Sequence, residues 1–396
     1  MKLGIYGGAF NPPHMGHIRA AAYGQKALGL SKVLLIPTNI SPHKASPKNT
    51  ASPAQRLKML ELAIKGQEGL QVSDMEIARG GSSYTYETVL SLKEEYPQGE
   101  LTLFMGTDMF LSFLQWKNPE IILKNAEIGV FYRGDRDEKA QVARQAEALK
   151  ARGARVQLIE NPVTQVSSTV LRSLLVFASA GGYLPQGVED YIRKEGLYGT
   201  GACYKALSLT DLEAAVAAFV KPERMAHVLG CRDMALELAQ RWGADPILAQ
   251  RAALLHDVTK ALDGDFQLTL CQGLGILLDD FSRAHPKTLH AFTGSVVAER
   301  VFGECKEVVA AIGSHTTGRP GMSTLEQIIY IADNMERTRT YPGVEKVREL
   351  AFRDLTEAVK LGLSNTIENL KTRAEGIHPQ GLATLAWLNE RKNEIC

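Results

Sequence analysis

The chain has 396 residues, of which 45% are hydrophobic, and its formal net charge is +1. This length fits two domains of about 200 residues each, and the apolar fraction is sufficient for buried cores. A nearly neutral charge argues against a general role in binding nucleic acids or membrane surfaces. Five scattered cysteines without a Cys-x-x-Cys pair fit reduced thiols. Without a signal peptide or an apolar run of about 18 residues, the expectation is a cytoplasmic protein.

The first segment with recognisable chemistry covers residues 7–17 and reads GGAFNPPHMGH. It follows an apolar, strand-like run at residues 3–6 and precedes a helical pattern over residues 18–28. A strand, a glycine turn and a helix in this order surround one concavity with backbone N–H groups and the positive end of a helix dipole. His14 and His17 would lie on the same face at the start of that helix. An ordinary turn requires neither histidine, so we interpret the segment as a phosphate site.

A lysine and a carboxylate follow two further strands of the first half. Lys44 lies in a polar, proline-broken loop after an apolar run at residues 33–37, and Asp108 follows the run 101–105. Ligands of parallel sheets collect at the carboxyl ends of the strands, which makes Lys44 a candidate phosphate cation and Asp108 a candidate ribose ligand. The alternatives are a solvated loop lysine and the N-cap of a helix over residues 109–114.

An aromatic side chain and a second anion site complete this pattern. Trp116 offers a flat surface for stacking on an aromatic ring, although a lone tryptophan more often belongs to the core. Arg172 lies one helical turn after Ser168 in the segment SSTVLR at residues 167–172. Hydroxyls, N–H groups at a helix start and a guanidinium together favour an anion, and a plain capped helix is the alternative.

The segments GGAFNPPHMGH, SPHK, GTD and SSTVLR together resemble bacterial nicotinate-nucleotide adenylyltransferase, over residues 1–200. The resemblance implies an α/β Rossmann-like nucleotidyltransferase domain. It also implies transfer of an adenylyl group from ATP, accompanied by Mg²⁺, to nicotinate mononucleotide, which gives deamido-NAD and pyrophosphate. His14 and His17 would be the catalytic residues on the ATP phosphates. The substrate- and ATP-binding residues that the resemblance implies are Gly7, Gly8, Phe10, Lys44, Thr85, Gly106, Asp108, Trp116, Arg133, Ser167, Ser168, Thr169 and Arg172.

Within that set, Lys44 and Arg172 would lie near the phosphates, Asp108 would hold a ribose, and Trp116 would stack on the nicotinate beside Thr85 and Arg133. Two positions depart from the family pattern. Residues 133–135 read RGD where the family usually has Arg-Pro-Gly, and Glu87 stands where it usually has aspartate. Sister families, such as phosphopantetheine adenylyltransferases, share the His-x-Gly-His core, so a different acceptor is an alternative. The prolines before His14 and the SPHK loop favour nicotinate.

After a glycine-rich segment at residues 199–202, strand-like runs almost vanish and helical periodicity takes over. We therefore expect residues 205–396 to form an all-α domain. Proline and glycine pairs bracket two expected helices, and a possible capping box from Ser323 to Glu326 begins another. The expected helical stretches include residues 222–243, 246–264, 299–309, 323–337 and 344–362.

Six imidazole and carboxylate side chains are spread over these helical segments: His227, His256, Asp257, His290, His315 and Asp333. Asp257 follows the apolar run 252–255 and Asp333 interrupts the run 328–332, where an acid is costly to bury without a partner. Any one of the six is more often structural than a ligand. Together they indicate a metal, and nitrogen and oxygen ligands without thiolate favour iron, manganese or a similar divalent ion over structural zinc.

These residues resemble the HD-domain phosphohydrolases, and among them the YqeK-like symmetrical diadenosine-tetraphosphate hydrolases. The matching segments are RMAH at residues 224–227, LLHDVTK at 254–260, His290, HTTG at 315–318 and YIAD at 330–333. The resemblance implies that His227, His256, Asp257 and Asp333 hold one metal, and that His290 and His315 complete a second site, with iron as the favoured metal. Lys260 would contact the polyphosphate as a catalytic residue; a solvated lysine is the alternative.

The sequence thus predicts a bifunctional cytoplasmic enzyme with ATP, nicotinate mononucleotide and diadenosine tetraphosphate as small-molecule substrates. It predicts no nucleic-acid or membrane partner and leaves a homo-oligomer open. Two alternatives concern the second half. The HD domain would hydrolyse another nucleotide phosphoester, or it would be a regulatory module that binds nucleotide without turnover.

Overall fold

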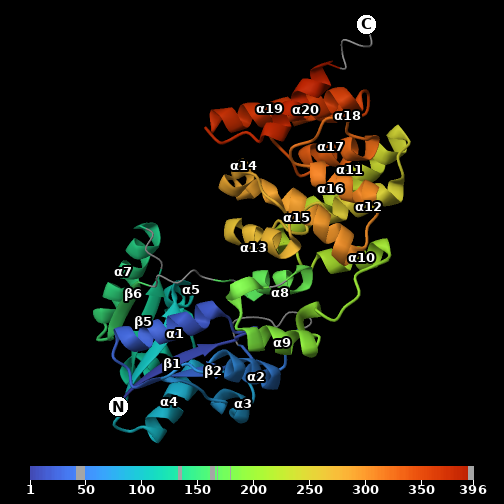
Figure 1. The fold of residues 1–396 in the computed structure, drawn as a ribbon. Helices are drawn as coiled ribbons and strands as arrows, with labels where there is room; N and C mark the ends of the chain where they lie inside the picture. Colours follow the sequence, from blue (N-terminus) through green and yellow to red (C-terminus); the bar gives the residue numbers. More distant parts are fainter. Residues whose placement is uncertain (42–49, 133–135, 161–165, 167, 179, 391–396) are drawn as a thin grey trace. The chain divides into compact units, whose positions relative to one another are not determined.

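The structure, a computed structural model, describes residues 1–41, 50–132, 136–160, 166, 168–178 and 180–390. The chain divides into two compact units. The first comprises Met1–Leu175 and Ala180–Gly201, and the second consists mainly of the residues from Ala202 onward. The sheet-containing first unit runs from blue to green in the ribbon drawing, and the helical second unit runs from yellow-green to red (Figure 1). In the described part of the chain, no helix is both long and apolar enough to cross a bilayer.

The first unit is built around a parallel sheet of six strands in the order β3-β2-β1-β4-β5-β6. The strands are β1 Lys2–Gly8, β2 Lys32–Pro37, β3 Leu70–Val72, β4 Glu100–Gly106, β5 Ala126–Tyr132 and β6 Val156–Glu160. This order confirms the predicted Rossmann-like α/β fold. The direction of strand addition reverses between β1 and β4, and ligands of such sheets bind at the carboxyl ends of the strands at that switch point.

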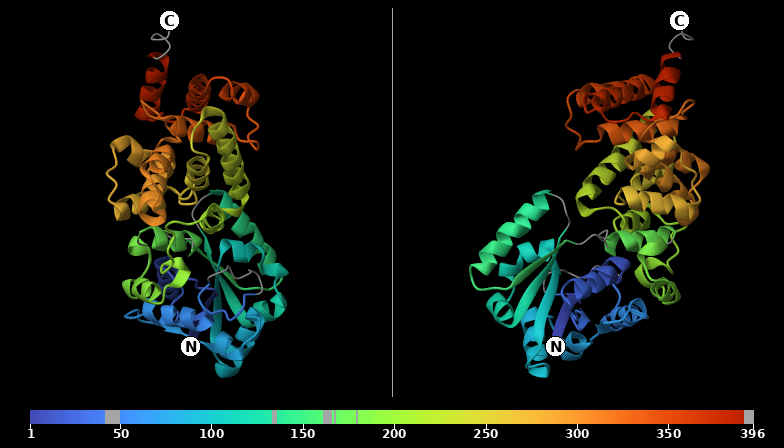
Figure 2. Two further views of the ribbon diagram at one scale, coloured as in Figure 1. Left: turned by 90° about the vertical axis from the view of Figure 1, so that its right-hand side faces the viewer. Right: turned by 60° about the vertical axis from the view of Figure 1, so that its left-hand side comes forward.

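Helices cover both faces of this sheet (Figure 2). On one face, Leu103 of β4 belongs to a buried cluster that also contains Val89. On the other face, a Cβ at Gly24 would lie 2.8 Å from the rings of both Phe104 and Phe131, so only glycine lets this helix approach so closely. The helices of the first half are α1 Met15–Ala27, α2 Pro53–Ala63, α3 Met75–Arg79, α4 Thr85–Glu95, α5 Thr107–Leu111, α6 Pro119–Asn125, α7 Arg136–Lys150, α8 Ser168–Phe177 and α9 Gln186–Lys194, with 3₁₀ turns η1 Phe113–Gln115, η2 Gly181–Tyr183 and η3 Leu197–Gly199.

The described residues of the second unit form helices and turns, which confirms the predicted all-α domain. The α-helices are α10 Leu209–Val216, α11 Met225–Trp242, α12 Pro246–Leu255, α13 Gly264–Leu274, α14 Asp280–Ala284, α15 Leu289–Val297, α16 Lys306–Ser314, α17 Thr324–Met335, α18 Val344–Ala351, α19 Leu355–Thr372 and α20 Pro379–Glu390. The shorter elements are the 3₁₀ turns η4 Pro222–Arg224 and η5 Pro286–Thr288 and the π-helix η6 Ala298–Phe302.

The expected bounds of three helices are wrong. Residues 299–309 are split between η6 and α16, because Gly303 between them takes the left-handed φ of 71° that ends a helix. Residues 344–362 form α18 and the start of α19, since Asp354 accepts a hydrogen bond from a backbone N–H and caps the second helix. The helix expected within residues 246–264 ends at Leu255, immediately before His256 and Asp257.

Helix α17 occupies the centre of the second unit and packs against α11, α12, α16 and α19. It begins with the predicted capping box of Ser323 and Glu326. Each residue from Leu325 to Ala332 is buried, so Asp333 follows a stretch that is enclosed on all sides. Helix α12 packs against the same helix, and its carboxyl end carries His256 and Asp257. The packing of two buried helices therefore brings the predicted ligands together.

Replacing Arg251 by alanine should lower the free energy of unfolding of the second unit by about 3–5 kcal/mol, because a buried carboxylate loses its partner. Arg251 lies on α12, its Nη2 is 2.6 Å from Oε1 of Glu304, and the Glu304 side chain is 3% exposed. The control Arg337→Ala removes an exposed ion pair with Glu237 and should cost less than about 1 kcal/mol. Urea unfolding followed by circular dichroism measures both. Equal losses in the two variants would contradict this role for Arg251.

Candidate functional sites

The turn after β1 leaves open space at the sheet's switch point. A Cβ built at Gly7 or at Gly106 would have no contact within 4 Å outside its own segment. Gly7 is the penultimate residue of β1, and Gly106 is the last residue of the neighbouring strand β4. Phe10 takes a left-handed φ of 47° and is 2% exposed, with its ring 3.3 Å from the position of a Cβ at Gly8. The Phe10 ring thus fills the space beside Gly8, and the space beside Gly7 and Gly106 is open to a ligand.

His14 and His17 cap the start of helix α1 with their rings. The N–H of His17 donates to Nδ1 of His14 at 3.4 Å, and the N–H of His14 donates to Nδ1 of His17 at 3.2 Å. The two rings stack with their centroids 3.6 Å apart. A ring whose Nδ1 accepts a hydrogen bond is neutral and carries its proton on Nε2. Each histidine therefore keeps one N–H donor at the helix start, where the helix dipole also favours an anion.

Burial is the cause of this neutral state. It lowers the pKa of His14 to about 4 and, together with the neighbouring His14, holds the pKa of His17 well below its ordinary range. Both side chains are consequently uncharged near neutral pH, and they would reach an anion as hydrogen-bond donors.

Three side chains from separate elements hold the turn in place. Arg56 of α2 donates to the carbonyls of Ala9, Thr38 and Asn39. Arg172 of α8 donates from Nη1 to the carbonyl of Asn11 at 2.8 Å, and the Tyr198 hydroxyl donates to Oδ1 of Asn11 at 2.7 Å. Arg172 thus lies beside residues 7–17 and orders the backbone there, and its contact with phosphate stays a prediction. Sequence reasoning missed Arg56 and assigned no role to Tyr198.

Asp108 and Trp116, the predicted ribose and nicotinate contacts, differ in their exposure to solvent. Asp108 is exposed in the first turn of α5, and the N-cap of that helix is Gly106, so the alternative of an N-cap at Asp108 is wrong. Trp116 is partly buried against the core and contacts Phe113, with the ring centroids 5.4 Å apart. The Lys117 ammonium lies 4.0 Å from the ring centroid of Tyr84, the residue before Thr85. That contact brings the segment of Trp116 beside the start of α4, where Thr85 lies.

Ser168 donates to the carbonyl of Pro12 at 3.4 Å. The predicted residues Lys44, Arg133 and Ser167, and the side chain of Thr169, lie outside the described part of the chain.

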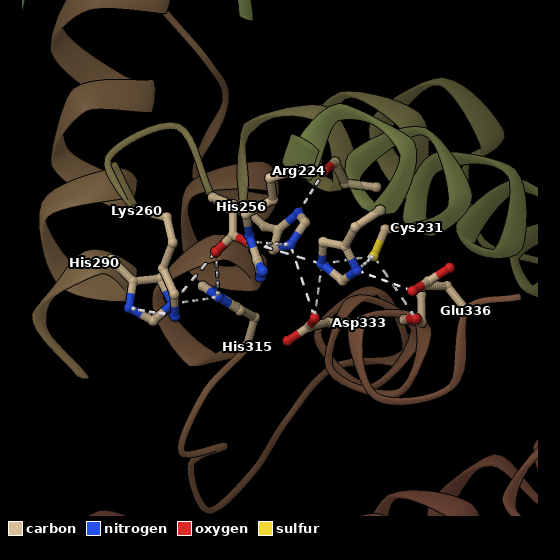
Figure 3. A network of polar contacts seen from close by, with 12 residues as sticks. Arg224, Cys231, His256, Lys260, His290, His315, Asp333 and Glu336 are labelled. Carbon is tan, nitrogen blue, oxygen red and sulfur yellow. Dashed lines mark hydrogen bonds and ion pairs between the residues drawn. The ribbon is translucent and has the colours of Figure 1, made fainter. Parts of the chain in front are cut away.

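In the second unit, all six predicted metal ligands gather in one cluster, in which Asp333 is partly exposed and the other five are buried (Figure 3). Asp257 lies at its centre with a side chain that is 1% exposed. Its Oδ2 is 3.4 Å from Nε2 of His256 and 3.8 Å from Nε2 of His227. Its Oδ1 is 3.4 Å from Nε2 of His290 and 3.8 Å from Nε2 of His315. Each oxygen of this carboxylate therefore faces its own pair of imidazoles.

Asp333 joins one of these two pairs. Its Oδ1 is 3.1 Å from Nε2 of His227 and 4.0 Å from Nε2 of His256. On the other side, the Nε2 atoms of His290 and His315 are 3.2 Å apart. The resemblance implied one metal on His227, His256, Asp257 and Asp333 and a second completed by His290 and His315, and this division stays a prediction. The donor atoms that lie within 4.8 Å of one another form the groups His227, Cys231, His256 and Asp333, and His256, Asp257 and His315.

The four imidazoles are oriented by their other ring nitrogen. Nδ1 lies 2.6 Å from the Ala253 carbonyl in His256, 2.8 Å from the Lys287 carbonyl in His290, and 2.7 Å from the Ile312 carbonyl in His315. Carbonyls only accept, so these Nδ1 atoms donate, and in a neutral ring Nε2 then presents a lone pair. Metal-binding histidines in proteins are oriented in this way.

His227 is oriented by a carboxylate instead. Its Nδ1 lies 3.0 Å from Oε1 of Glu336, whose side chain is 0% exposed. Both the N–H and the hydroxyl of Thr338 donate to that carboxylate. A Cβ at Gly230 would lie 2.5 Å from Oε2 of Glu336, so glycine is required where α11 passes the carboxylate. Sequence reasoning missed Glu336, and the only signal for it is a glutamate one residue past the end of the apolar helix α17.

Most titratable groups of the cluster are in the state that binds a metal. Burial would raise the pKa of Asp257, but the His256 imidazole, whose Nε2 lies 3.4 Å from Oδ2, holds it well below the usual range. Asp333 has a low pKa for similar reasons, with His227 as its hydrogen-bond partner. Burial lowers the pKa of His315 to about 4 and that of His290 well below its ordinary range, so both rings are neutral. Metal ligation requires ionised carboxylates and neutral imidazoles.

Two further side chains of the cluster, His256 and Cys231, also bear on metal binding. Burial opposes a charge on His256, but the Asp257 carboxylate raises its pKa, and its buried Nε2 has no hydrogen-bond partner. A cation between these groups would satisfy that atom. Cys231, one helical turn after His227, lies with Sγ 3.5 Å from Nε2 of that ring. Burial raises the pKa of Cys231 well above its usual value, so it is a neutral thiol here. The donor atoms of His227, Cys231, His256 and Asp333 lie within 4.8 Å of one another, so nitrogen and oxygen donors with the Cys231 sulfur in reach fit a divalent metal.

Three cationic side chains border the cluster. Arg224 is paired with Asp257, and Nη2 of Arg339 lies 2.6 Å from Oδ1 of Asp333. Nζ of Lys260 lies 2.9 Å from Nε2 of His290. Burial lowers the pKa of Lys260, and the nearby Asp257 opposes that shift. Sequence reasoning named Lys260 but assigned no role to Arg224 or Arg339, which complete a border of positive charge suited to phosphate.

When the pH is lowered, the free energy of unfolding of the first unit should decrease more steeply in the native chain than in a His14→Asn variant. Folded His14 has a lowered pKa, so the unfolded chain binds more protons as the pH falls from 6.5 towards 4. Between pH 7.5 and 5 this costs about 2 kcal/mol in the native chain. Asparagine keeps a capping acceptor but does not titrate in this range. Hydrogen exchange of the β1 amides measures the difference, and parallel pH dependences in the two proteins would contradict it.

Glu336→Gln should weaken metal binding by about 10- to 100-fold, because loss of an outer-shell carboxylate reduces the basicity and fixed orientation of His227. Chelator competition followed by metal analysis measures this. The matched control is Glu326→Gln at the other end of α17, where a carboxylate that is 1% exposed pairs with Arg319 away from the cluster. It should cost stability and leave metal affinity unchanged. An equal loss of affinity in both variants would reduce Glu336 to a structural role.

Comparison with known proteins divides the chain in the same way. The family described as Cytidylyltransferase-like matches residues 5–174, and the family described as HD domain matches residues 224–338. The chain is 34% identical over 218 residues to the probable nicotinate-nucleotide adenylyltransferase of Desulfatibacillum aliphaticivorans, covering 50% of this chain and 100% of that protein. It is 38% identical over 208 residues to the corresponding protein of Aeromonas salmonicida, covering 50% of this chain and 96% of that one.

Among solved structures, a predicted HD superfamily hydrolase involved in NAD metabolism, from Clostridium acetobutylicum, is 33% identical. The match covers 47% of this chain and 98% of that one, with a TM-score of 0.46. An HD domain implies a divalent metal, which agrees with the donors described above. Over its first half, the chain belongs to the nicotinate-nucleotide adenylyltransferase family, and its second half contains an HD domain.

Proposed function

We propose that this chain is a bifunctional enzyme whose first unit adenylylates nicotinate mononucleotide and whose second unit cleaves diadenosine tetraphosphate symmetrically into two ADP. The first activity follows from the family. The second rests on one observation above all, the buried Asp257 carboxylate with two imidazoles at each oxygen. Such an arrangement suits two metal ions with cationic side chains beside them. A polyphosphate is a substrate that would use both the metal ions and the cationic side chains.

In the first unit, the reaction needs alignment and charge stabilisation and no covalent intermediate. A phosphate oxygen of nicotinate mononucleotide attacks the α-phosphorus of ATP, and pyrophosphate leaves. His14 and His17 donate from Nε2 to the phosphates at the start of α1, where Mg²⁺ accompanies ATP. Lys44, Arg172 and the hydroxyls of residues 167–169 would lie near the phosphates.

The other predicted residues bind a ribose and the nicotinate ring of the acceptor. Asp108, exposed beside the switch point, holds a ribose. Trp116 stacks on the nicotinate, and Thr85 and Arg133 line that pocket. The close approach of the Trp116 segment to the start of α4, through Lys117, supports this placement.

In the second unit, His227, His256, Asp257 and Asp333 would hold one metal ion, and His290 and His315 a second with Asp257 between them; iron is the proposed metal. The bound ions would act as Lewis acids on the phosphoryl oxygens and lower the pKa of water. Arg224, Lys260 and Arg339 bind the negative charge of the polyphosphate and position its central bond. Cleavage between the second and third phosphates gives two ADP.

Single substitutions should separate the two activities. His17→Ala removes one phosphate donor and should reduce adenylyl transfer at least about 100-fold while sparing hydrolysis. Asp257→Ala should remove bound metal and hydrolysis and spare transfer. Chromatography of products from ATP with nicotinate mononucleotide, and from diadenosine tetraphosphate, measures both rates.

Four outcomes would contradict this account. A fall of both activities in either variant would refute the division into two sites. Full metal content in Asp257→Ala would refute the ligand assignment. ATP and AMP as products would refute symmetrical cleavage. Hydrolysis of only a cyclic dinucleotide or a guanosine nucleotide in a substrate panel, or of no nucleotide at all, would favour another phosphohydrolase or a regulatory module.

A further inference from the structure

Three cavities adjoin the metal-ligand cluster in the described part of the chain. The smallest, of about 350 Å³, reaches Arg224, His227 and Lys260. The two larger ones differ from it in reaching His290 and His315 respectively. The first of these two, here called the apolar chamber, has a volume of about 880 Å³ and reaches Lys260 and His290. The second, here called the amide chamber, has a volume of about 410 Å³ and reaches His315 and Asp333. Sites for small organic ligands typically measure about 300–1,000 Å³, so each chamber is large enough for a nucleoside.

The walls of the two chambers differ in chemistry. Aliphatic side chains of the apolar chamber include Leu262, Leu363, Ile367, Leu370 and Ile377. The amide chamber is lined by Asn334, Asn365 and Asn369, with Tyr330 and Tyr341. An aliphatic wall buries the faces of a base, and amide groups pair with the edge of a base or with ribose hydroxyls.

Each chamber also has a cation in contact with the ligand cluster, Lys260 in the first, which Lys287 lines as well, and Arg339 in the second. Both cations contact a ligand of the cluster, His290 and Asp333 respectively. A phosphate chain that leaves either chamber would meet a positive charge and then the metal site.

The chambers share Thr316 and Thr366. Thr366 has a backbone partner, since its hydroxyl donates to the Gly362 carbonyl at 2.9 Å. The hydroxyl of Thr316, the residue after His315, is buried and has no hydrogen-bond partner in the described structure. A buried hydroxyl without a partner costs about 1–3 kcal/mol, and a ligand oxygen at this position would remove that cost.

We propose that the two chambers bind the two nucleosides of one substrate and that the hydroxyl of Thr316 donates to the polyphosphate where it passes between them. This inference rests on the proposed function of the second unit and adds where each end of the substrate lies. A substrate with identical ends is therefore held in two unlike environments, one nucleoside among aliphatic side chains and the other among amides.

Gly381 offers a way to fill one chamber. It is buried, it lines the apolar chamber, and a Cβ built there would meet one atom within 4 Å, the Thr317 carbonyl oxygen at 3.8 Å. Gly381→Leu should therefore place a side chain in the chamber without a backbone clash. Ala383→Leu adds bulk to the exposed face of the same helix and serves as the control. Asn365→Leu alters the amide chamber with little change in volume.

The test is calorimetric titration of the metal-loaded full-length protein with ADP and, separately, with inorganic tripolyphosphate. Saturating deamido-NAD occupies the nucleotide site of the first unit. The native protein and Ala383→Leu should bind two ADP per chain. Gly381→Leu and Asn365→Leu should each lose one of these sites and keep their tripolyphosphate affinity within twofold. Thr316→Val should weaken tripolyphosphate and ADP together by several-fold, and Thr316→Ser should restore both.

Two ADP sites retained in Gly381→Leu and in Asn365→Leu, or a single ADP site in the native chain, would overturn the inference. Parallel losses of ADP and tripolyphosphate binding in both chamber variants would also overturn it, because they would reflect damage to the metal site. The proposed function fails separately. Two ADP sites that respond as expected, in a protein that does not cleave diadenosine tetraphosphate, would leave the chambers in place and refute the substrate.

Discussion

The buried carboxylate of Asp257 is the group on which the second unit depends. Taking an isolated carboxylate out of water is so costly that it is tolerated only with close partners. Here the partners are the four imidazoles around its two oxygens and the guanidinium of Arg224. Those imidazoles come from α11, α15 and the ends of α12 and α16, so the carboxylate defines where four helices must meet. The packing of these four helices and the geometry of the site therefore depend on the same carboxylate.

In the proposed function, the two units would bind phosphate by different physical means. In the first, neutral histidines, backbone N–H groups and a helix start offer hydrogen-bond donors, and burial keeps the rings uncharged. In the second, the carboxylates of Asp257 and Asp333 and the imidazoles around them form a candidate cation site, and Arg224, Lys260 and Arg339 add positive charge around it. The first arrangement suits transfer between nucleotides that bring Mg²⁺ with them. The second suits a metal that stays with the protein.

Much of this could be predicted from the sequence, because the decisive signals are local. An acid directly after an apolar run, as at Asp257, is conspicuous in a single sequence, and the glycines and histidines of residues 7–17 are adjacent in the chain. Residues that act over long distances carried no such signal. Arg56 looks like an ordinary helix residue until Ala9 and Thr38 are placed beside it, and Glu336 gains its role only through His227.

The chambers and several helix bounds were also beyond prediction. The apolar chamber is enclosed by segments more than one hundred residues apart, from Lys260 to Gly381, so no local pattern outlines it. Helix bounds depended on single residues, such as the left-handed Gly303, whose conformation composition does not fix. Lys44, Arg133 and Ser167 stay predictions, since they lie outside the described residues.

The central claim is that Asp257 lies between two metal ions in the second unit. Anomalous X-ray scattering from crystals of the iron- or manganese-loaded protein tests it most directly. The account predicts two anomalous peaks per chain, one beside each oxygen of Asp257, the first near His227, His256 and Asp333 and the second near His290 and His315. A single peak, or peaks that do not adjoin the Asp257 carboxylate, would contradict it.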